Sequence, residues 1–220
     1  MISFDDYEKI LIGIGGSFNH DFDKELSLSE QYKSVVNNKK VEILKAYNKL
    51  ADLLDGKDYY VVSTCNDDCI YESNIDKNRV VTPCGGYRFI QCEDDCAHEL
   101  LAFSENMLDE IDNMLCPHCG KKVVFNRMPL EHYNEGGYLD AWEQYQKWLQ
   151  STINKKLLIL ELGVGMEYPT VIRFAFEKLA YYNNKAKMIR VHEKLAFSTP
   201  ELQDKCICEK MGAVEFLNNM

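Results

Sequence analysis

Hydrophobic residues fall along this chain in two kinds of pattern, short runs and helical repeats. Residues 8–13, 59–64 and 157–162 are short runs rich in apolar side chains, which predict strands that are covered on both faces of a sheet. Between the first two runs, apolar residues recur every three or four positions over residues 41–54. This spacing predicts a helix, and Gly56 is placed to end it because glycine adopts left-handed conformations without strain.

The rest of the chain continues this alternation of strands and helices. Residues 79–82 and 187–192 predict further strands, and an aromatic face over residues 138–149 predicts a helix. Proline is favoured in the first turn of a helix, so a helix is also expected over residues 169–181 and a final one over 200–211. Strands that alternate with helices are typical of a parallel sheet with crossover helices on both faces.

Four cysteines occur as two close pairs in the middle of the chain. Cys92 and Cys96 form a C-x3-C pair, and Cys116 and Cys119 lie within Cys-Pro-His-Cys-Gly about twenty residues later. Each pair forms one knuckle, and two knuckles complete the tetrahedral coordination of a structural zinc ion. We therefore expect an α/β fold, a Rossmann-like parallel sheet with helices on both faces, that carries a small inserted zinc-binding module.

The positions of the cysteine pairs predict the domain boundaries. The zinc-binding module is expected at residues 84–125, between residues 1–83 and 126–220, which together would form the Rossmann-like domain. Residues 19–34 are the least periodic part of the chain and predict a mobile loop.

Composition excludes several classes of function. Of the 220 residues 46% are hydrophobic, but no run approaches the roughly 18 apolar residues of a membrane span. The start lacks the basic-then-apolar pattern of a secretory signal, so the nine cysteines are interpreted as thiols in a reducing cytoplasm. The net charge of −10 argues against nucleic-acid binding, which depends on clustered lysine and arginine. We expect a cytoplasmic protein that binds neither nucleic acid nor membrane.

The first chemical motif directly follows the first predicted strand. Gly13, Gly15 and Ser17 belong to Gly-Ile-Gly-Gly-Ser, and glycines at such a place let backbone N–H groups approach a phosphate closely. Glycine after a strand also makes ordinary turns, so this motif alone leaves nucleotide binding open.

Two further candidate segments follow predicted strands. Asn66 and Asp68 come after the strand at 59–64, and ligands of open α/β sheets bind at the carboxyl ends of strands. An Asn-x-Asp sequence is also common in turns. Cys84 lies in a turn eight residues before Cys92, where a reactive group would lie between the nucleotide domain and the metal module.

The order of these motifs resembles that of the sirtuins. Gly-x-Gly-x-Ser is followed first by Thr-x-Asn-x-Asp and then by a turn eight residues before the first zinc cysteine. Cys-Pro-x-Cys-Gly comes next, and a buried strand that ends in Glu-Leu-Gly-Val-Gly at 161–165 comes last. The sequence looks closest to the bacterial branch linked to macrodomain operons, which the C-x3-C spacing also fits. The resemblance covers most of the chain from residue 46 onward.

The resemblance implies that the chain uses NAD and zinc and acts on a protein. Sirtuins cleave the bond between nicotinamide and ribose and transfer ADP-ribose to an acyl oxygen, which gives lysine deacylation, or in the macrodomain-linked branch to a protein acceptor. By position, Asn66 would orient the nicotinamide ribose, Asp68 would hold the carboxamide, and Cys84 would occupy the third catalytic place. The implied cofactor-binding residues are Gly13, Gly15, Ser17, Asn66, Asp68, Gly163, Val164, Gly165, His192, Cys206 and Ile207.

Cys84 is the main departure from the family pattern. Deacylating sirtuins have a catalytic histidine there, the macrodomain-linked branch usually has glutamine, and a thiol acts as a base only when its pKa is depressed. The leading hypothesis is therefore an NAD-consuming transferase that passes ADP-ribose to a protein acceptor, since this activity depends least on a catalytic histidine at position 84. The alternatives are an NAD-dependent deacylase of acyl-lysine proteins and a catalytically inactive homologue that binds NAD or ADP-ribose.

The other cysteines and histidines leave a second set of alternatives open. The acidic stretch at 93–95 either recruits a basic partner or is a solvated loop. Six further residues are interpreted either as metal ligands or as side chains that pack in the core or face solvent: Cys65, Cys69, His98, His118, Cys206 and Cys208.

Overall fold

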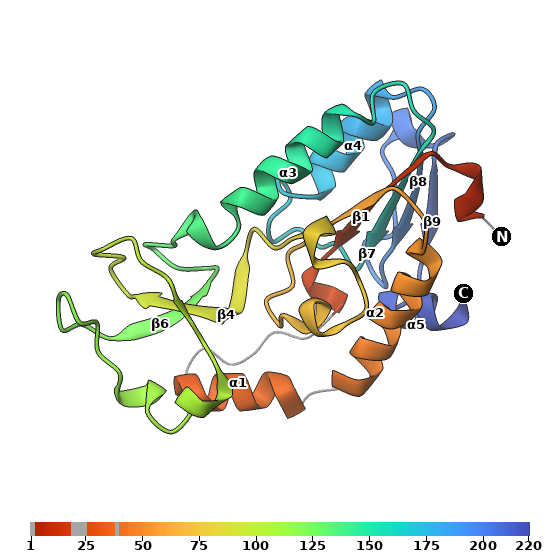
Figure 1. Cartoon of the computed structure of the whole chain (residues 1–220). Helices are drawn as coiled ribbons and strands as arrows, with labels where there is room; N and C mark the ends of the chain where they lie inside the picture. The colour runs from red at the N-terminus through yellow and green to blue at the C-terminus, as the bar shows by residue number, and fades with distance from the viewer. Residues whose placement is uncertain (1–2, 19–25, 38–39) are drawn as a thin grey trace.

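The computed structural model describes residues 3–18, 26–37 and 40–220 of the chain. Figure 1 shows a larger lobe built on a parallel sheet and a smaller lobe that carries β4 and β6. The strands are β1 (Lys9–Ile14), β2 (Tyr59–Ser63), β3 (Val80–Val81), β4 (Gly85–Cys92), β5 (Leu101–Ala102), β6 (Val123–Arg127), β7 (Leu157–Leu162), β8 (Lys187–Val191) and β9 (Cys206–Glu209). The α-helices are α1 (Leu28–Asn37), α2 (Lys40–Leu54), α3 (Leu139–Gln150), α4 (Arg173–Tyr182) and α5 (Ala213–Asn219).

The larger lobe is built on a six-stranded sheet in the order β3-β2-β1-β7-β8-β9, in which every neighbouring pair is parallel. Successive residues of a strand point to opposite faces. Ile10 and Ile12 of β1 therefore pack with residues of α2 and α5, whereas Leu11 packs with residues of α3 and α4 (Figure 1). This arrangement confirms the predicted Rossmann-like sheet with helices on both faces.

The strand order reverses between β1 and β7. The chain runs outward from β1 through β2 and β3 on one side, and through β7, β8 and β9 on the other. Ligands of open α/β sheets bind outside the carboxyl ends of the strands at such a reversal. The turns that follow β1 and β7 are therefore the place to examine for a site.

The smaller lobe is an antiparallel sheet in the order β5-β4-β6 with its own hydrophobic cluster around Tyr87, Ile90 and Phe125. Helix α1 packs on this cluster, and the backbone N–H of Ser29 donates to Asp112 Oδ1 at 2.9 Å. A segment from the N-terminal part of the chain thus joins the lobe that contains residues 84–125. The division of the chain into 1–83 with 126–220 and 84–125 stays a prediction.

One loop prediction and one helix prediction are wrong in part. Residues 28–34, expected in a mobile loop, belong to α1, and residues 19–25 of that expected loop lie outside the described residues. The expected final helix is a single turn at Pro200–Leu202 followed by strand β9, because the backbone of that segment pairs with the edge of β8. Cys206 and Cys208 therefore lie on a strand and not on a helix.

The other helices agree with the sequence patterns more closely. Helix α2 covers the predicted 41–54, and Gly56 beyond it has the left-handed φ of +67°. Helix α4 begins at Arg173, four residues after Pro169, whose carbonyl accepts from the Phe174 N–H at 2.8 Å. Within the described ranges, no helix has the length and apolar character needed to cross a membrane.

Candidate functional site

The turns after β1 and β7 touch backbone to backbone. The Gly15 N–H donates to the Leu162 carbonyl at 2.9 Å, and a Cβ added to Gly15 would lie under 3.0 Å from the Gly163 carbonyl oxygen and from Val164 Cα. Gly163 itself has a left-handed φ of +64°. Only glycine fits at position 15, so the close contact of these two turns explains two of the glycines predicted from the sequence.

The other predicted glycines have different surroundings. A Cβ on Gly13 would overlap the side chains of Ile172 and Phe176, so this glycine lets α4 pack closely on the sheet. A Cβ on Gly165 would meet no atom within 4 Å. Ser17 lies in the short 3-10 turn Gly16–Phe18, and its side chain is outside what the structure describes. Gly165 is thus an open position beside the two contacting turns.

Asn66 and Cys84 are brought together through Met128. Asn66 Nδ2 donates to the Met128 carbonyl at 3.0 Å, and the Met128 N–H donates to the Cys84 carbonyl at 2.8 Å. Cys65, next to Asn66, donates its thiol to the Gly15 carbonyl at 3.1 Å. These bonds link the end of β2 to the turn after β1 and to the start of the smaller lobe.

The Cys84 side chain is buried and electrically neutral near pH 7. Burial raises the pKa of the Cys84 thiol to about 12, and the negative charge of Glu167 adds to the shift. A thiol with such a pKa does not supply a thiolate base at neutral pH. The geometry therefore offers no replacement for a catalytic histidine at position 84.

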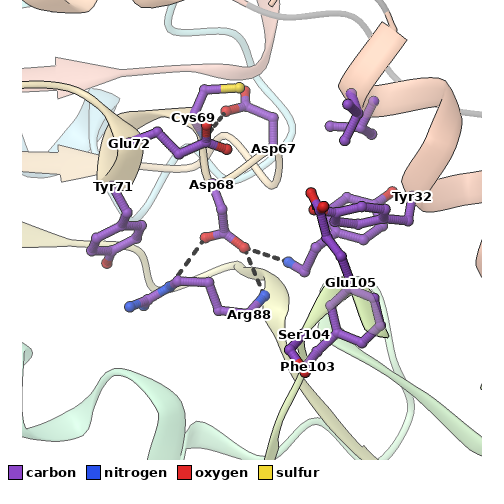
Figure 2. A pocket seen from close by; sticks show the side chains of 13 residues that line it. Tyr32, Asp67, Asp68, Cys69, Tyr71, Glu72, Arg88, Phe103, Ser104 and Glu105 are labelled. Atoms are coloured by element: carbon purple, nitrogen blue, oxygen red, sulfur yellow. Dashed lines mark hydrogen bonds and ion pairs between the residues drawn. The ribbon is translucent and has the colours of Figure 1, made fainter. Parts of the chain in front are cut away.

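Asp68 holds the start of β4 with its carboxylate (Figure 2). Its Oδ2 accepts from the backbone N–H of Tyr87 and, at 2.9 Å, from that of Arg88, whose Nε lies 3.4 Å from Oδ1. Gly86 is required beside it, because a Cβ there would overlap the carboxylate. Burial raises the pKa of Asp68 to about 6, although the positive charge of Arg88 opposes the shift.

A cavity of about 260 Å³ opens next to Asp68. Figure 2 shows Tyr32, Phe103 and Tyr71 around the carboxylate, so aromatic rings from α1 and from the smaller lobe form much of the wall. The carboxylates of Asp67, Glu72 and Glu105 line the cavity together with that of Asp68. Aromatic walls with carboxylate acceptors suit a flat ring that carries an N–H donor. The cavity extends the candidate site between the two lobes.

His192 follows β8 at the same edge of the sheet. Its Nδ1 accepts from the N–H groups of Lys194 and Leu195 at 3.0 and 3.1 Å, which leaves the proton of the neutral ring on Nε2. Burial and the positive charge of Arg173 lower the pKa of His192, which favours the neutral form. The ring can therefore donate one hydrogen bond from Nε2, as binding to a hydroxyl requires.

Cys206 and Ile207 are not brought to the other predicted residues. They begin β9 and pair with Met188 and Ile189, whereas the carboxyl end of β9 is Glu209, whose carbonyl accepts from the His192 N–H. The site edge of this strand thus carries the residues from Glu209 onward. That Cys206 and Ile207 bind a cofactor stays a prediction. Their position at the start of β9, away from its carboxyl end, does not favour it.

A buried ionic network, which the sequence patterns did not indicate, supports the loops of the site. Arg190 on β8 contacts Glu161 on β7 through Nε at 2.6 Å and Nη2 at 3.2 Å, and Glu177 at 2.9 Å. Arg173 donates to the Val164 carbonyl at 3.5 Å and to Leu195 at 3.3 Å. The signal for it is that Glu161 and Arg190 interrupt otherwise apolar strands, since charges are rarely buried unpaired.

Glu167 is a second residue that the sequence did not identify. It follows Gly163 by four positions, and its Oε2 lies 3.3 Å from the position that a Cβ on Gly16 would take. Its charge acts on Cys84, as noted above. The carboxylate therefore lies between the glycine turn after β1 and the start of the smaller lobe.

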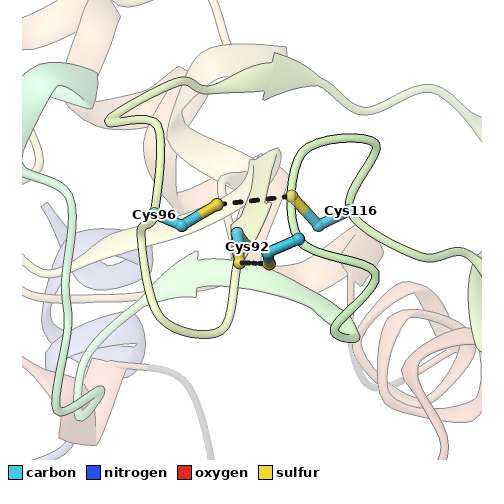
Figure 3. Close-up of side chains that lie close together, drawn as sticks. Cys92, Cys96 and Cys116 are labelled. Carbon is cyan, nitrogen blue, oxygen red and sulfur yellow. Dashed lines mark hydrogen bonds between the residues drawn. The ribbon is translucent and has the colours of Figure 1, made fainter.

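The four predicted zinc ligands lie together in the smaller lobe (Figure 3). Their sulfur atoms are all within 4.8 Å of one another, with Cys92 to Cys119 at 3.5 Å and Cys96 to Cys116 at 3.6 Å. Zn–S bonds of about 2.3 Å give sulfur separations of about 3.8 Å in a tetrahedron. The cluster has the donor set and the size of a structural zinc site.

The other candidate ligands are engaged elsewhere. His98 contacts Asp95 Oδ2 at 2.7 Å and His118 contacts Glu99 Oε2 at 3.0 Å. Cys65 and Cys69 are buried in the hydrophobic core of the larger lobe, which favours their packing role over metal binding.

No protein-family model matches the sequence. Sir2 bound to an acetylated peptide superposes with a TM-score of 0.63 at 15% identity, over 99% of this chain and 93% of that one. Sir2Tm bound to a propionylated peptide gives a TM-score of 0.62 at 16% identity, over 99% and 93%. The chain has the sirtuin fold.

Two curated proteins have detectable sequence similarity to this sirtuin-fold chain. A probable bifunctional ADP-ribose hydrolase/ADP-ribosyltransferase of Fusarium oxysporum f. sp. cubense is 27% identical over 154 residues, which cover 62% of this chain and 26% of that protein. A protein ADP-ribosyltransferase of Staphylococcus aureus is 22% identical over 176 residues, which cover 74% of this chain and 56% of that protein. The chain thus matches about a quarter of one relative's length and just over half of the other's.

Proposed function

We propose that this chain binds NAD, cleaves the bond between nicotinamide and ribose, and transfers ADP-ribose to a protein acceptor. The observation that carries the proposal is the backbone contact of Gly15 with Gly163 and Val164 at the strand reversal. Cys65, the neighbour of Asn66 in the chain, bonds to the Gly15 carbonyl. The relatives named as ADP-ribosyltransferases and the solved Sir2 complexes with NAD and peptides support it. Zinc, held by the four clustered cysteines, has a structural role in this proposal.

The turns after β1 and β7 would bind the diphosphate of NAD through backbone N–H groups. Arg173 and Arg190 are committed to carbonyl and carboxylate groups within the larger lobe and do not point charge at a ligand. Oriented N–H groups supply positive potential without a charged side chain. His192 would donate from Nε2 to a ribose hydroxyl, and Asp68 would accept from the carboxamide of nicotinamide in the cavity beside it.

In the transfer, the bond from ribose C1′ to the nicotinamide nitrogen breaks and its electron pair leaves with nicotinamide. The ribose becomes positively charged, and a preorganised negative group stabilises such a charge. Glu167, whose carboxylate lies beside Gly16, would take this role and would accept the proton that the acceptor loses when its oxygen bonds to C1′. Asn66, held by the Met128 carbonyl, would keep the ribose in position.

The state of Cys84 favours this function over lysine deacylation. Deacylation needs a base at position 84, and burial keeps the pKa of that thiol at about 12. Transfer to an acceptor beside Glu167 needs no base there. We also place the protein in the cytoplasm, because none of the nine cysteines forms a disulfide. Four are the proposed zinc ligands and the other five are free thiols, as a reducing compartment would keep them.

Nicotinamide release from NAD by the zinc-loaded protein, measured by chromatography, tests the proposal. We expect Asn66→Ala to abolish release while zinc stays at one ion per chain, and Asn78→Ala, an exposed asparagine of the turn Lys77–Arg79, to leave release unchanged. Release that persists in Asn66→Ala removes Asn66 from the mechanism. Release only with an acyl-lysine peptide identifies a deacylase, and binding of ADP-ribose without release identifies an inactive homologue.

The role of Glu167 has its own test. Glu167→Gln keeps the size of the side chain but removes its charge, so we expect much slower release with nearly unchanged affinity for ADP-ribose. Cys84→Ser serves as the comparison and should retain release. The opposite pattern, slow release in Cys84→Ser and normal release in Glu167→Gln, would assign the chemistry to the thiol.

A further inference from the structure

A second cavity, of about 200 Å³, lies beside the four cysteines in the smaller lobe. Apolar side chains that include Ile90, Leu101, Leu115 and Val123 line it. Leu101 and Leu115 keep 53% and 57% of their surface exposed. Exposed leucines at the mouth of a cavity offer a socket for an apolar side chain of another protein.

The segment that builds this cavity is strongly acidic. From Phe89 to Gly120 it has eight carboxylates and no lysine or arginine, so with neutral histidines its formal charge is −8, of −10 for the whole chain. Asp94 is paired with Lys121, just outside the segment. The eight are Glu93, Asp94, Asp95, Glu99, Glu105, Asp109, Glu110 and Asp112. Such a field repels acidic proteins and attracts basic ones.

Strand β5 gives this surface an exposed sheet edge. In the described part of the chain β5 is an outer strand of the sheet β5-β4-β6, and both of its residues, Leu101 and Ala102, are exposed. An outer strand presents backbone N–H and C=O groups on its free side, with which an extended peptide can pair. The pairing gives affinity, and alternate side chains of the added strand give specificity.

We infer that the edge of β5, the cavity beside it and the carboxylates of Asp95 and Glu99 in the cavity wall form a docking surface for a lysine- or arginine-rich extended segment of a partner protein. We call this surface the acidic face. Because side chains alternate along a strand, the segment that fits alternates basic and apolar residues, with the apolar ones in the cavity and the basic ones near Glu93 and Glu99. The inference does not depend on ADP-ribose transfer, since none of Leu101, Leu115, Glu93 and Glu99 lines the cavity beside Asp68.

Fluorescence anisotropy with two labelled peptides tests the acidic face on the zinc-loaded full chain. One peptide alternates lysine and valine, and the other has glutamate in place of every lysine. We expect only the lysine peptide to bind, with an affinity that falls as salt is raised from low to physiological concentration. Equal binding of both peptides, or binding that salt does not change, would overturn the inference.

Three variants locate the binding. Leu101→Ser with Leu115→Ser removes the apolar socket, and Glu93→Lys with Glu99→Lys reverses the charge. Each pair should weaken the lysine peptide at least about tenfold. Ile207→Ser is the matched control, because Ile207 is an exposed apolar residue on the outer strand of the other sheet.

Zinc content and the thermal midpoint show that each variant is folded. Unchanged affinity in both paired variants, or equal weakening in Ile207→Ser, would show that the peptide does not bind at the acidic face. The peptide-binding assay does not measure nicotinamide release. A negative result for the acidic face therefore leaves the proposed ADP-ribose transfer untouched, and a negative result for ADP-ribose transfer leaves the acidic face untouched.

Discussion

Alanine replacements at three glycines separate the roles that the structure gives to the turns of the dinucleotide site. Gly15→Ala places a methyl group under 3.0 Å from the backbone of Gly163 and Val164, which cannot rotate away as a side chain would. Overpacking costs about 1–3 kcal/mol, and the backbone contact puts Gly15→Ala at about 3 kcal/mol. For a protein of this size, 3 kcal/mol lowers the thermal midpoint by roughly 6–12 °C.

The other two positions are graded controls for this effect. Gly13→Ala meets only the side chains of Ile172 and Phe176, which can shift in part, so we expect a cost of about 1–3 kcal/mol. Gly165→Ala meets no atom within 4 Å, and its stability should stay within about 0.5 kcal/mol of the original protein. If the diphosphate lies where proposed, Gly165→Ala should still weaken NAD binding about tenfold, because the methyl group blocks close approach of the backbone.

Thermal unfolding of the zinc-loaded proteins and calorimetric titration with NAD and ADP-ribose measure the two effects. An unchanged midpoint for Gly15→Ala would refute the backbone contact between the turns. Full NAD affinity in Gly165→Ala would refute the place given to the diphosphate, even if the ranking of stabilities holds.

Three further predictions concern charge and metal. Burial raises the pKa of Asp68 from 3.8 to about 6, so between these pH values the folded protein binds more protons than the unfolded one. Stability therefore falls as pH rises, by about 1 kcal/mol between pH 5 and 7.5. The difference in urea midpoints between wild type and Asp68→Asn should show this loss. Arg190→Met leaves Glu161 buried without its partner and should lower the free energy of unfolding, measured in urea, by about 3–5 kcal/mol. The double variant with Glu161→Met should recover most of that loss. No recovery would rule out the unpaired charge as the cause. Cys116→Ser should lower both bound zinc, measured by atomic absorption, and the thermal midpoint, since structural zinc binding is itself folding free energy; a metal-free variant with a normal midpoint would contradict this.

Buried strands and metal ligands are the features that the sequence reveals best. Residues 157–162 are β7 with the bounds that the pattern predicts, because a strand covered on both faces shows as an apolar run without help from the rest of the fold. The four zinc cysteines are equally readable, since two short pairs can close only on a common centre.

Elements that are partly exposed, or that pack on the other lobe, are harder to predict from the sequence. Strand β9 is only partly buried, so its Cys-Ile-Cys-Glu sequence lacks an apolar run, and its strand conformation depends on pairing with β8. Helix α1 packs on the smaller lobe, and its apolar residues meet partners more than fifty positions away, such as Phe103. Such packing partners cannot be inferred from local spacing.

The residues that the sequence did not indicate share one property: their partners come from separate elements. Glu161 and Arg190 face each other only through the register of β7 and β8. Glu167 reaches Gly16 only because its loop folds back over the turn after β1. Register and loop paths are tertiary properties, so a motif search finds the glycines of the site and misses the carboxylate next to them.

The charges around the dinucleotide site constrain what chemistry it can perform. The guanidinium groups of Arg173 and Arg190 are used inside the fold, His192 is held neutral, and Cys84 is a neutral thiol. A dinucleotide bound as proposed would therefore meet backbone N–H groups at its phosphates and the charge of Glu167 near its ribose. That arrangement stabilises a positive ribose more than it activates a weak nucleophile, because the latter needs a strong base. These charges therefore support the proposed cleavage of NAD as the step that the site would accelerate, with the acceptor supplied by the partner protein.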